Sequence, residues 1–171
     1  MSERQIDPGH FSQDAEDLLR LLHSHAVRFL LIGGEAVIFH GYSRFTGDLD
    51  IFYARDGANC EALFAALTAF WGGPVPCVES ADELEEVDMV FQFGRPPNRV
   101  DLLSSVAGIE FAKAWARREE ATLGDVRVAF LGLRDLILSK RAAGRHKDKE
   151  DLRYLKRVLE NRLQSKPRVD P

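Results

Sequence analysis

The stretch LLIGGEAVIFHGYSRFTGDLDIFY, residues 30–53, contains the features that decide the fold. One apolar run ends at the pair Gly33–Gly34, and a second apolar run contains Asp48 and Asp50, separated by one leucine. Strands normally exclude aspartate, so two aspartates in one short strand need a local reason. Because side chains at positions i and i+2 of a strand point to the same face, we expect the two carboxylates to project together.

A third aspartate, Asp101, lies in the apolar run RVDLL, residues 99–103. If this strand lies beside the first, three carboxylates meet on one side of a sheet, and they cannot all stay ionised without a counter-charge. Mg²⁺ prefers a few carboxylates together with phosphate oxygens and water, and two such ions about 4 Å apart can hold the attacking and leaving oxygens of a phosphoryl displacement. We therefore expect Asp48, Asp50 and Asp101 to be catalytic and to bind two Mg²⁺ ions. Any one of these aspartates alone is more often a loop or edge-strand residue.

The glycine pair stands between a predicted strand, residues 27–32, and a predicted short helix, residues 34–41. Without Cβ atoms the backbone can approach a ligand closely, and the N–H groups of a helix N-terminus favour an anion. Thirteen residues, 35–47, separate Gly34 from Asp48, which is enough for one short helix and a return to the sheet. The spacing predicts glycines and carboxylates at neighbouring strand ends; the alternative is a plain strand-to-helix turn.

Basic residues near the C-terminus offer partners for phosphate. The predicted helix over residues 133–143 has an apolar stripe that helical spacing extends to Lys140, so the lysine ammonium is expected at the rim of the core, where a phosphate can meet it. Asp148 and Asp151 of the last helix could hold Lys140 or Arg145 in place. The alternative is that these aspartates stabilise the helix N-terminus and that Lys140 only extends toward solvent.

Periodicity predicts a mixed α/β (α+β) chain with a mixed β-sheet, flanking helices and a helical C-terminal part. We expect one domain over residues 1–164, with a core at 27–130, closing helices at 132–164 and a disordered tail at 165–171. Helices are predicted over residues 11–26, 34–41, 60–70, 108–118, 133–143 and 147–163, with a loop or single helical turn at 80–86. Strands are predicted over residues 27–32, 47–53, 87–93, 99–104, 121–124 and 126–131.

Composition excludes several classes of protein. The net charge of −4 gives no global attraction to nucleic acid or anionic lipid. No apolar stretch approaches the length of a membrane span, and the N-terminus lacks an apolar signal core, so we expect no membrane partner. Cys60 and Cys77 show neither paired spacing nor nearby histidines, which indicates free thiols in a reducing, cytoplasmic location.

The pattern from Gly33 to Ile51 resembles the signature of the DNA polymerase beta-like nucleotidyltransferase superfamily. In that superfamily a hydrophobic strand runs into Gly-Gly or Gly-Ser, a short helix follows, and an acidic-hydrophobic-acidic strand comes next. The stretch RFTGDLD, residues 44–50, resembles a small bacterial branch that includes abortive-infection type toxins and antibiotic nucleotidyltransferases. The run KRAAGRHKD, residues 140–148, is similar to the closing motif of the toxin-like members. Many members carry serine where this chain has Gly34.

This resemblance implies a nucleotidyltransferase fold, with Mg²⁺ held by Asp48 and Asp50 and with Asp101 in the third acidic position. It implies that the glycine pair lies near the triphosphate and that Lys140 contacts phosphate, so Lys140 is expected to be catalytic together with the three aspartates. Arg44 is expected either at the nucleotide or only at the carboxylates. The residues expected to contact nucleotide are Gly33, Gly34, Arg44, Thr46, Lys140 and Arg145.

The expected activity is metal-dependent transfer of a nucleoside monophosphate from a nucleoside triphosphate such as ATP to an acceptor, with release of pyrophosphate. One alternative is a non-catalytic nucleotide-binding module or toxin–antitoxin partner with the same fold; another is a phosphohydrolase that uses water as the acceptor. The sequence leaves the acceptor open among tRNA, a protein and a small molecule. The basic face formed by Lys149, Arg153 and Lys156 is usually only solvated, and tRNA binding is its alternative role. A partner protein or a second copy of the chain is expected to complete the acceptor pocket, and the expected protein partners are an antitoxin or a second copy in a homodimer.

Overall fold

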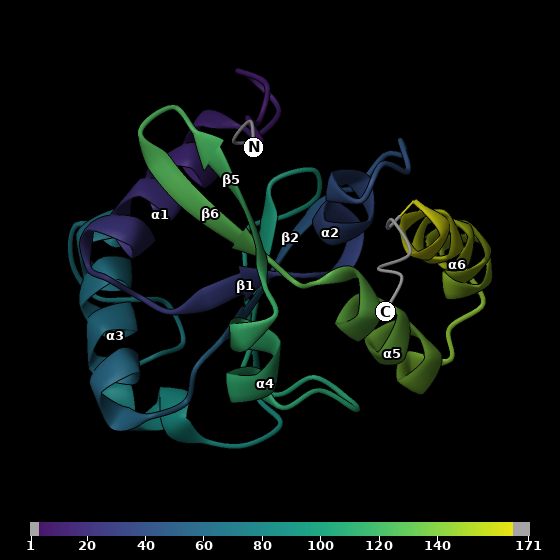
Figure 1. Ribbon diagram of the computed structural model, residues 1–171. Helices are drawn as coiled ribbons and strands as arrows, with labels where there is room; N and C mark the ends of the chain where they lie inside the picture. Colours follow the sequence, from purple (N-terminus) through teal and green to yellow (C-terminus); the bar gives the residue numbers. More distant parts are fainter. Residues whose placement is uncertain (1–3, 166–171) are drawn as a thin grey trace, which may run out of the picture.

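The computed structural model describes residues 4–165, in which six strands form one mixed sheet with the order β3-β4-β2-β1-β6-β5 (Figure 1). Strands β2 and β4 run parallel, as do β1 and β6, and the other neighbouring pairs are antiparallel. The strands are β1 (Phe29–Leu31), β2 (Asp48–Tyr53), β3 (Val90–Phe93), β4 (Arg99–Leu103), β5 (Glu119–Leu123) and β6 (Val126–Phe130). The predicted α+β class, a mixed sheet flanked by helices, is confirmed.

Helices cover both faces of this sheet (Figure 1). The first and third helices pack on one face, and the second, fourth, fifth and sixth pack on the other, so the core consists of two apolar clusters separated by the sheet. The helices are α1 (Gln13–Ser24), α2 (Gly33–Phe39), α3 (Gly57–Trp71), α4 (Phe111–Ala116), α5 (Leu133–Ala143) and α6 (Asp148–Gln164), with a 3-10 turn η1 (Ala81–Glu85). Each helix predicted from the periodicity is present, although α3 is longer at both ends than predicted.

The alternation along β2 separates apolar from acidic side chains. Leu49 and Ile51 are buried in the cluster beneath α1 and α3. Because successive side chains of a strand point to opposite faces, Asp48 and Asp50 project toward the face covered by α2, α5 and α6. The fold therefore presents the two carboxylates on the same side of the sheet as the predicted basic residues.

Three further predictions concern membrane-spanning segments, thiols and the tail. Within residues 4–165, no helix is long and apolar enough to cross a membrane. Cys60 is buried, Cys77 is exposed, and both are free thiols. The predicted disorder of residues 165–171 lies, apart from Ser165, outside the described residues.

Candidate active site

The three predicted carboxylates come together at the junction of two parallel strands. Strand β2 pairs with β4 in a register that sets Asp50 directly opposite Asp101 and Asp48 opposite Arg99. Asp101 is 7% exposed, whereas Asp48 and Asp50 are half-buried. The adjacency of the two strands, on which the predicted cluster depended, is therefore observed.

Arg99 supplies a counter-charge to two of these carboxylates. Its Nη2 donates to Asp48 Oδ2 at 2.8 Å and to Asp101 Oδ2 at 3.1 Å. Its Nε lies 3.0 Å from Asp101 Oδ1 without the alignment of a hydrogen bond, and within residues 4–165 Asp48 Oδ1 and Asp101 Oδ1 have no hydrogen-bond donor. Among those residues no three His, Cys, Asp or Glu side chains are already arranged to hold a metal ion.

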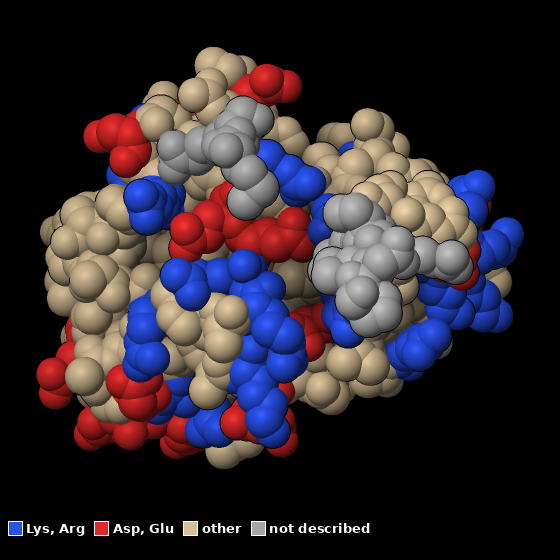
Figure 2. All heavy atoms as spheres, viewed as in Figure 1, with Lys and Arg blue, Asp and Glu red and all other residues tan. Residues whose placement is uncertain are grey.

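Among residues 4–165, no lysine, arginine or histidine forms an ion pair with Asp50, the third carboxylate of this junction. Burial, followed by the negative charges of Asp101 and Asp48, raises the pKa of Asp50 to about 6. Lys147 and Arg145, from the segment between α5 and α6, act on this pKa in the opposite direction. In Figure 2 acidic side chains gather in the middle of the face that is viewed, with basic side chains around them. The junction thus holds more negative charge than its own residues neutralise.

Gly33 lies against Asp50 and has no room for a side chain. Its φ is +57°, in the left-handed region, and a Cβ at this position would overlap Asp50 Oδ2. The backbone of the first turn of α2 and the carboxylate of β2 are therefore in direct contact. The predicted helix began at Gly34, whereas α2 already begins at Gly33.

We expect Gly33→Ala to lower the free energy of unfolding by about 2–4 kcal/mol, because it combines backbone strain with overlap against a carboxylate. Gly72→Ala is the matched control, since Gly72 has φ +66° and nothing within 4 Å of a Cβ. It isolates the backbone term, expected near 1 kcal/mol. Urea unfolding of both variants measures the difference. Equal losses would show that Asp50 does not press against Gly33.

Gly34 adjoins Thr46 and Arg44. A Cβ on Gly34 would overlap the Thr46 hydroxyl and would lie 3.4 Å from Arg44 Nη2. The Thr46 hydroxyl therefore occupies the space that a serine side chain at position 34 would need. Thr46 also donates to the backbone carbonyl of Asp48 at 3.3 Å, so the loop that leads into β2 is fixed beside the glycines.

Lys140 lies in a buried ion network that joins α5 to α6. Its Nζ donates to Asp148 Oδ1 at 2.9 Å and lies 2.7 Å from Asp151 Oδ2. The side chains of Lys140, Asp148 and Asp151 are 8%, 5% and 3% exposed. Arg44 Nη2 lies 3.2 Å from the same Asp151 oxygen. Both aspartates thus hold Lys140, as one of the two predicted alternatives stated, but its ammonium is buried rather than at the rim.

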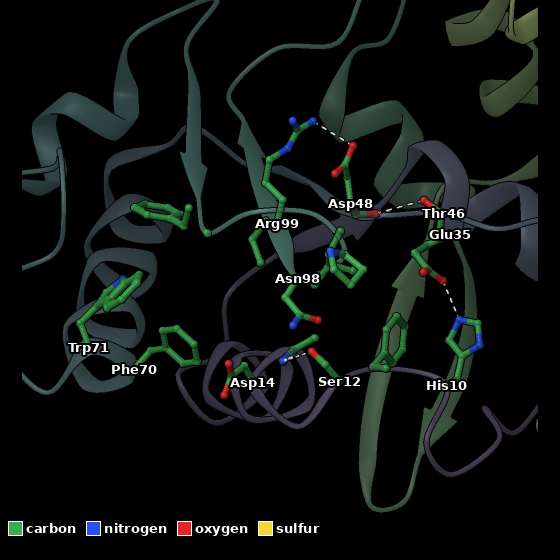
Figure 3. Close-up of a pocket in the computed structure, with 17 residues that line it drawn as sticks. His10, Ser12, Asp14, Glu35, Thr46, Asp48, Phe70, Trp71, Asn98 and Arg99 are labelled. Carbon is green, nitrogen blue, oxygen red and sulfur yellow. Dashed lines mark hydrogen bonds and ion pairs between the residues drawn. The ribbon is translucent and has the colours of Figure 1, made fainter.

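A cavity of about 180 Å³ adjoins the carboxylates (Figure 3). Asp48, Thr46 and Arg99 line one side, and Phe70 and Trp71 line another. Opposite these aromatic residues, His10 Nε2 and Glu35 Oε2 are 2.7 Å apart (Figure 3). The hydrogen bond to Glu35, against the opposing effect of burial, raises the pKa of His10 above its usual value.

Sequence reasoning missed Arg99, the His10–Glu35 pair and the aromatic side of the cavity. For Arg99 a signal was present, because it stands two residues before Asp101 and so shares its strand face. The His10–Glu35 pair connects helix α2 with the segment that precedes α1, and no local sequence pattern predicts such a contact. Trp71 is the last residue of α3, one residue beyond the helix predicted over residues 60–70.

Comparison with known proteins adds family membership to this geometry. Among curated proteins, none matches the chain. Residues 10–164 match a family model described as "Nucleotidyltransferase of unknown function (DUF6036)". The match spans α1 to α6 and includes the carboxylate junction, the glycine pair and the Lys140 network. The chain therefore belongs to the DUF6036 family of nucleotidyltransferases.

Proposed function

We propose that the chain is a metal-dependent nucleotidyltransferase of the DNA polymerase beta-like type, close to the branch of small bacterial toxin-like enzymes. It transfers a nucleoside monophosphate from a nucleoside triphosphate to an acceptor hydroxyl. The observation that carries the proposal is the register of β2 and β4, which sets Asp50 opposite Asp101 with Asp48 on the same face. A cluster of this kind is costly without a cation, and a triphosphate bound with Mg²⁺ supplies one.

The residues present suit Mg²⁺. Asp48 Oδ1 and Asp101 Oδ1 are buried oxygens that lack a donor within the described chain, and the charge of Asp50 is disfavoured by burial and by the other two aspartates. Carboxylate oxygens are the ligands that a hard cation prefers. Asp48, Asp50 and Asp101 would hold the metal, which would neutralise charge on the reacting phosphate.

In the proposed reaction the acceptor oxygen forms a bond to the α-phosphorus, and the bond from that phosphorus to the oxygen bridging to the β-phosphate breaks. Pyrophosphate leaves with the electron pair, and Asp101 takes the proton of the acceptor hydroxyl. Arg145 and Lys147, which are exposed beside Asp50, offset the charge of the leaving phosphates.

The phosphate site is assigned to the backbone of Gly33 and Gly34 together with Arg44, whose guanidinium adjoins Gly34. Thr46 fixes the loop on the other side of Gly34. Lys140 holds Asp151, and Asp151 lies against Arg44, so we assign Lys140 first to positioning Arg44. Its direct contact with phosphate stays a prediction.

The test incubates the protein with Mg²⁺, candidate acceptors and each of the four ribonucleoside triphosphates labelled at the α-phosphate. The label is expected to move from one triphosphate to an acceptor, and Asp48→Ala is expected to abolish the transfer. If no triphosphate is consumed and calorimetry detects no triphosphate binding, the proposal is wrong. Release of nucleoside monophosphate without a labelled product would indicate a hydrolase instead.

A second candidate is a non-catalytic nucleotide-binding module. The ion pairs of Arg99 with Asp48 and Asp101 favour it, because they neutralise two carboxylates without a metal. Calorimetry separates the two candidates: triphosphate binding in the absence of any turnover supports the module.

For an enzyme, Arg99 must leave these carboxylates when Mg²⁺ binds. We expect Arg99→Met to tighten Mg²⁺ binding about tenfold, because the competing guanidinium is gone and the carboxylates remain. Titration calorimetry with Mg²⁺ alone measures the affinity. Arg95→Met is the control, since Arg95 is exposed in the neighbouring loop, and it is expected to change nothing. Weaker binding in Arg99→Met would show that Arg99 supports the metal site rather than competing with it.

A further inference from the structure

The cavity beside Asp48 lies on the other side of the carboxylates from Arg145 and Lys147. Leu49 and Phe93, which line it, belong to the apolar cluster beneath α1 and α3. Asp50, by contrast, projects to the opposite face of the sheet, where Arg145 and Lys147 act on it. Asp48 lines the cavity and also belongs to the carboxylate junction, so it stands at the boundary between the two regions.

The direction of the reaction decides what belongs in this cavity. In an in-line displacement the attacking and leaving oxygens lie on opposite sides of the phosphorus. This inference rests on the proposed function, which puts the leaving pyrophosphate on the side of Arg145 and Lys147. The attacking hydroxyl then comes from the side of the cavity.

The walls of the cavity select the chemistry of the occupant. Trp71 is 41% exposed. The centroid of its ring lies 5.4 Å from that of Phe70 and 5.9 Å from that of Phe93, so the three rings form an open aromatic surface. In Figure 3 this surface faces Asp48 and Arg99 on one side and His10 and Glu35 on another. Aromatic surfaces of this kind bind flat rings and cations.

The charge of the lining residues and the volume of the cavity restrict the occupant further. Asp14, Glu35 and Asp48 line the cavity together with one guanidinium and one imidazole, which pair with Asp48 and Glu35, so among the lining residues the carboxylate of Asp14 has no offsetting charge. An anionic occupant is therefore disfavoured. The volume of about 180 Å³ suits one ring with a short substituent, since a cavity of about 150 Å³ holds benzene.

We propose that this cavity binds the acceptor, and that the acceptor is a small neutral or cationic compound with one aromatic ring and a hydroxyl group. The ring lies against Trp71 and Phe70, the hydroxyl points to the carboxylate junction, and a cationic substituent lies near Asp14. A phosphorylated acceptor such as an RNA end does not suit these walls.

The chain has two tryptophans, which makes the cavity directly observable. Trp115 lies on α4, packed against Phe111 and Arg118, and is not among the residues that line the cavity. In a Trp115→Phe variant, Trp71 is the sole fluorescent indole. The probes are tyramine, tyrosol and 3-(4-hydroxyphenyl)propionate, which share a phenol and a two-carbon chain and differ in charge.

Tyramine and tyrosol are expected to change the fluorescence of Trp71 saturably, and the anionic propionate to bind at least about tenfold more weakly than tyramine. Asp14→Asn is expected to weaken the binding of tyramine and to leave the affinity for tyrosol unchanged. In a Trp71→Phe variant, the fluorescence of the remaining Trp115 is expected to stay unchanged when the probes are added. The proposal is overturned if none of the three probes changes the Trp71 signal, or if the propionate binds as tightly as tyramine.

A non-hydrolysable triphosphate with Mg²⁺ completes the test. It is expected to bind together with tyramine; competition between the two would put the nucleoside in the cavity and overturn the proposal. Labelled transfer distinguishes failure of the proposed function, because probe binding without transfer from any triphosphate leaves the cavity assignment standing. Transfer to an acceptor that does not disturb Trp71 would refute the cavity assignment alone.

Discussion

An Asp50→Asn variant is expected to lose nucleotide transfer on the order of 10³-fold and, without divalent cations, to be more stable than the wild type. Both effects come from the Asp50 carboxylate, which would bind the metal and whose ionisation is disfavoured in the folded site. The folded state raises the pKa of Asp50 to about 6 from 3.8, so it binds the proton more tightly than the unfolded state does. The stability that Asp50 contributes is therefore fully present below pH 3.8 and is lost as the pH rises through about 6. Asparagine cannot ionise and keeps that stability at neutral pH.

At about 1.4 kcal/mol per pKa unit, the gain is on the order of 2–3 kcal/mol. Urea unfolding at neutral pH in a chelator, repeated with Mg²⁺ and a non-hydrolysable triphosphate, measures it. The ligands are expected to stabilise the wild type and not the variant. Asp17→Asn, an exposed position on α1, is the control and is expected to change stability by less than about 0.5 kcal/mol. An Asp50→Asn protein no more stable than the control would mean that neither burial nor the two neighbouring carboxylates disfavour the charge of Asp50 in the folded state.

Lys140→Met is expected to lower the free energy of unfolding by about 3–5 kcal/mol, because it leaves Asp148 and Asp151 buried without their main counter-charge. Triphosphate affinity should fall as well, since Asp151 no longer holds Arg44 in one place. Urea unfolding and calorimetry measure the two effects.

Two variants make this result specific. Lys149→Met alters an exposed lysine of α6 and is expected to have little effect on stability. Adding Asp148→Asn to Lys140→Met removes one of the unpaired charges and is expected to restore part of the stability. If Lys140→Met unfolds like the wild type but binds triphosphate poorly, Lys140 contacts phosphate directly rather than positioning Arg44.

Much of the fold could be predicted because its patterns are local. The helix over residues 133–143 was predicted with its observed bounds, since an apolar stripe precedes a glycine at the C-terminus. The placement of Asp48 and Asp50 on one face followed from strand geometry alone. The placement of Asp101 beside them could be predicted only on the condition that β2 and β4 are neighbours. The periodicity of one strand does not tell which strand pairs with it.

The missing parts of the site depend on tertiary contacts. Asp148 and Asp151 could be predicted from spacing as partners of Lys140. The burial of the Lys140 ammonium depends on how α6 packs against α5, and the apolar stripe of one helix does not determine that packing. Trp71 and His10 lie on opposite sides of one cavity although they are far apart in the chain. No local rule brings the end of α3 to the segment before α1.

The most direct test of the carboxylate site is a crystal structure of the protein soaked with a non-hydrolysable nucleoside triphosphate and Mn²⁺. We predict anomalous density from the metal among Asp48, Asp50 and Asp101, the phosphates against Gly33 and Gly34, and Arg99 displaced from both of its carboxylates. A triphosphate bound elsewhere, with Arg99 still bonded to Asp48 and Asp101, would contradict the account.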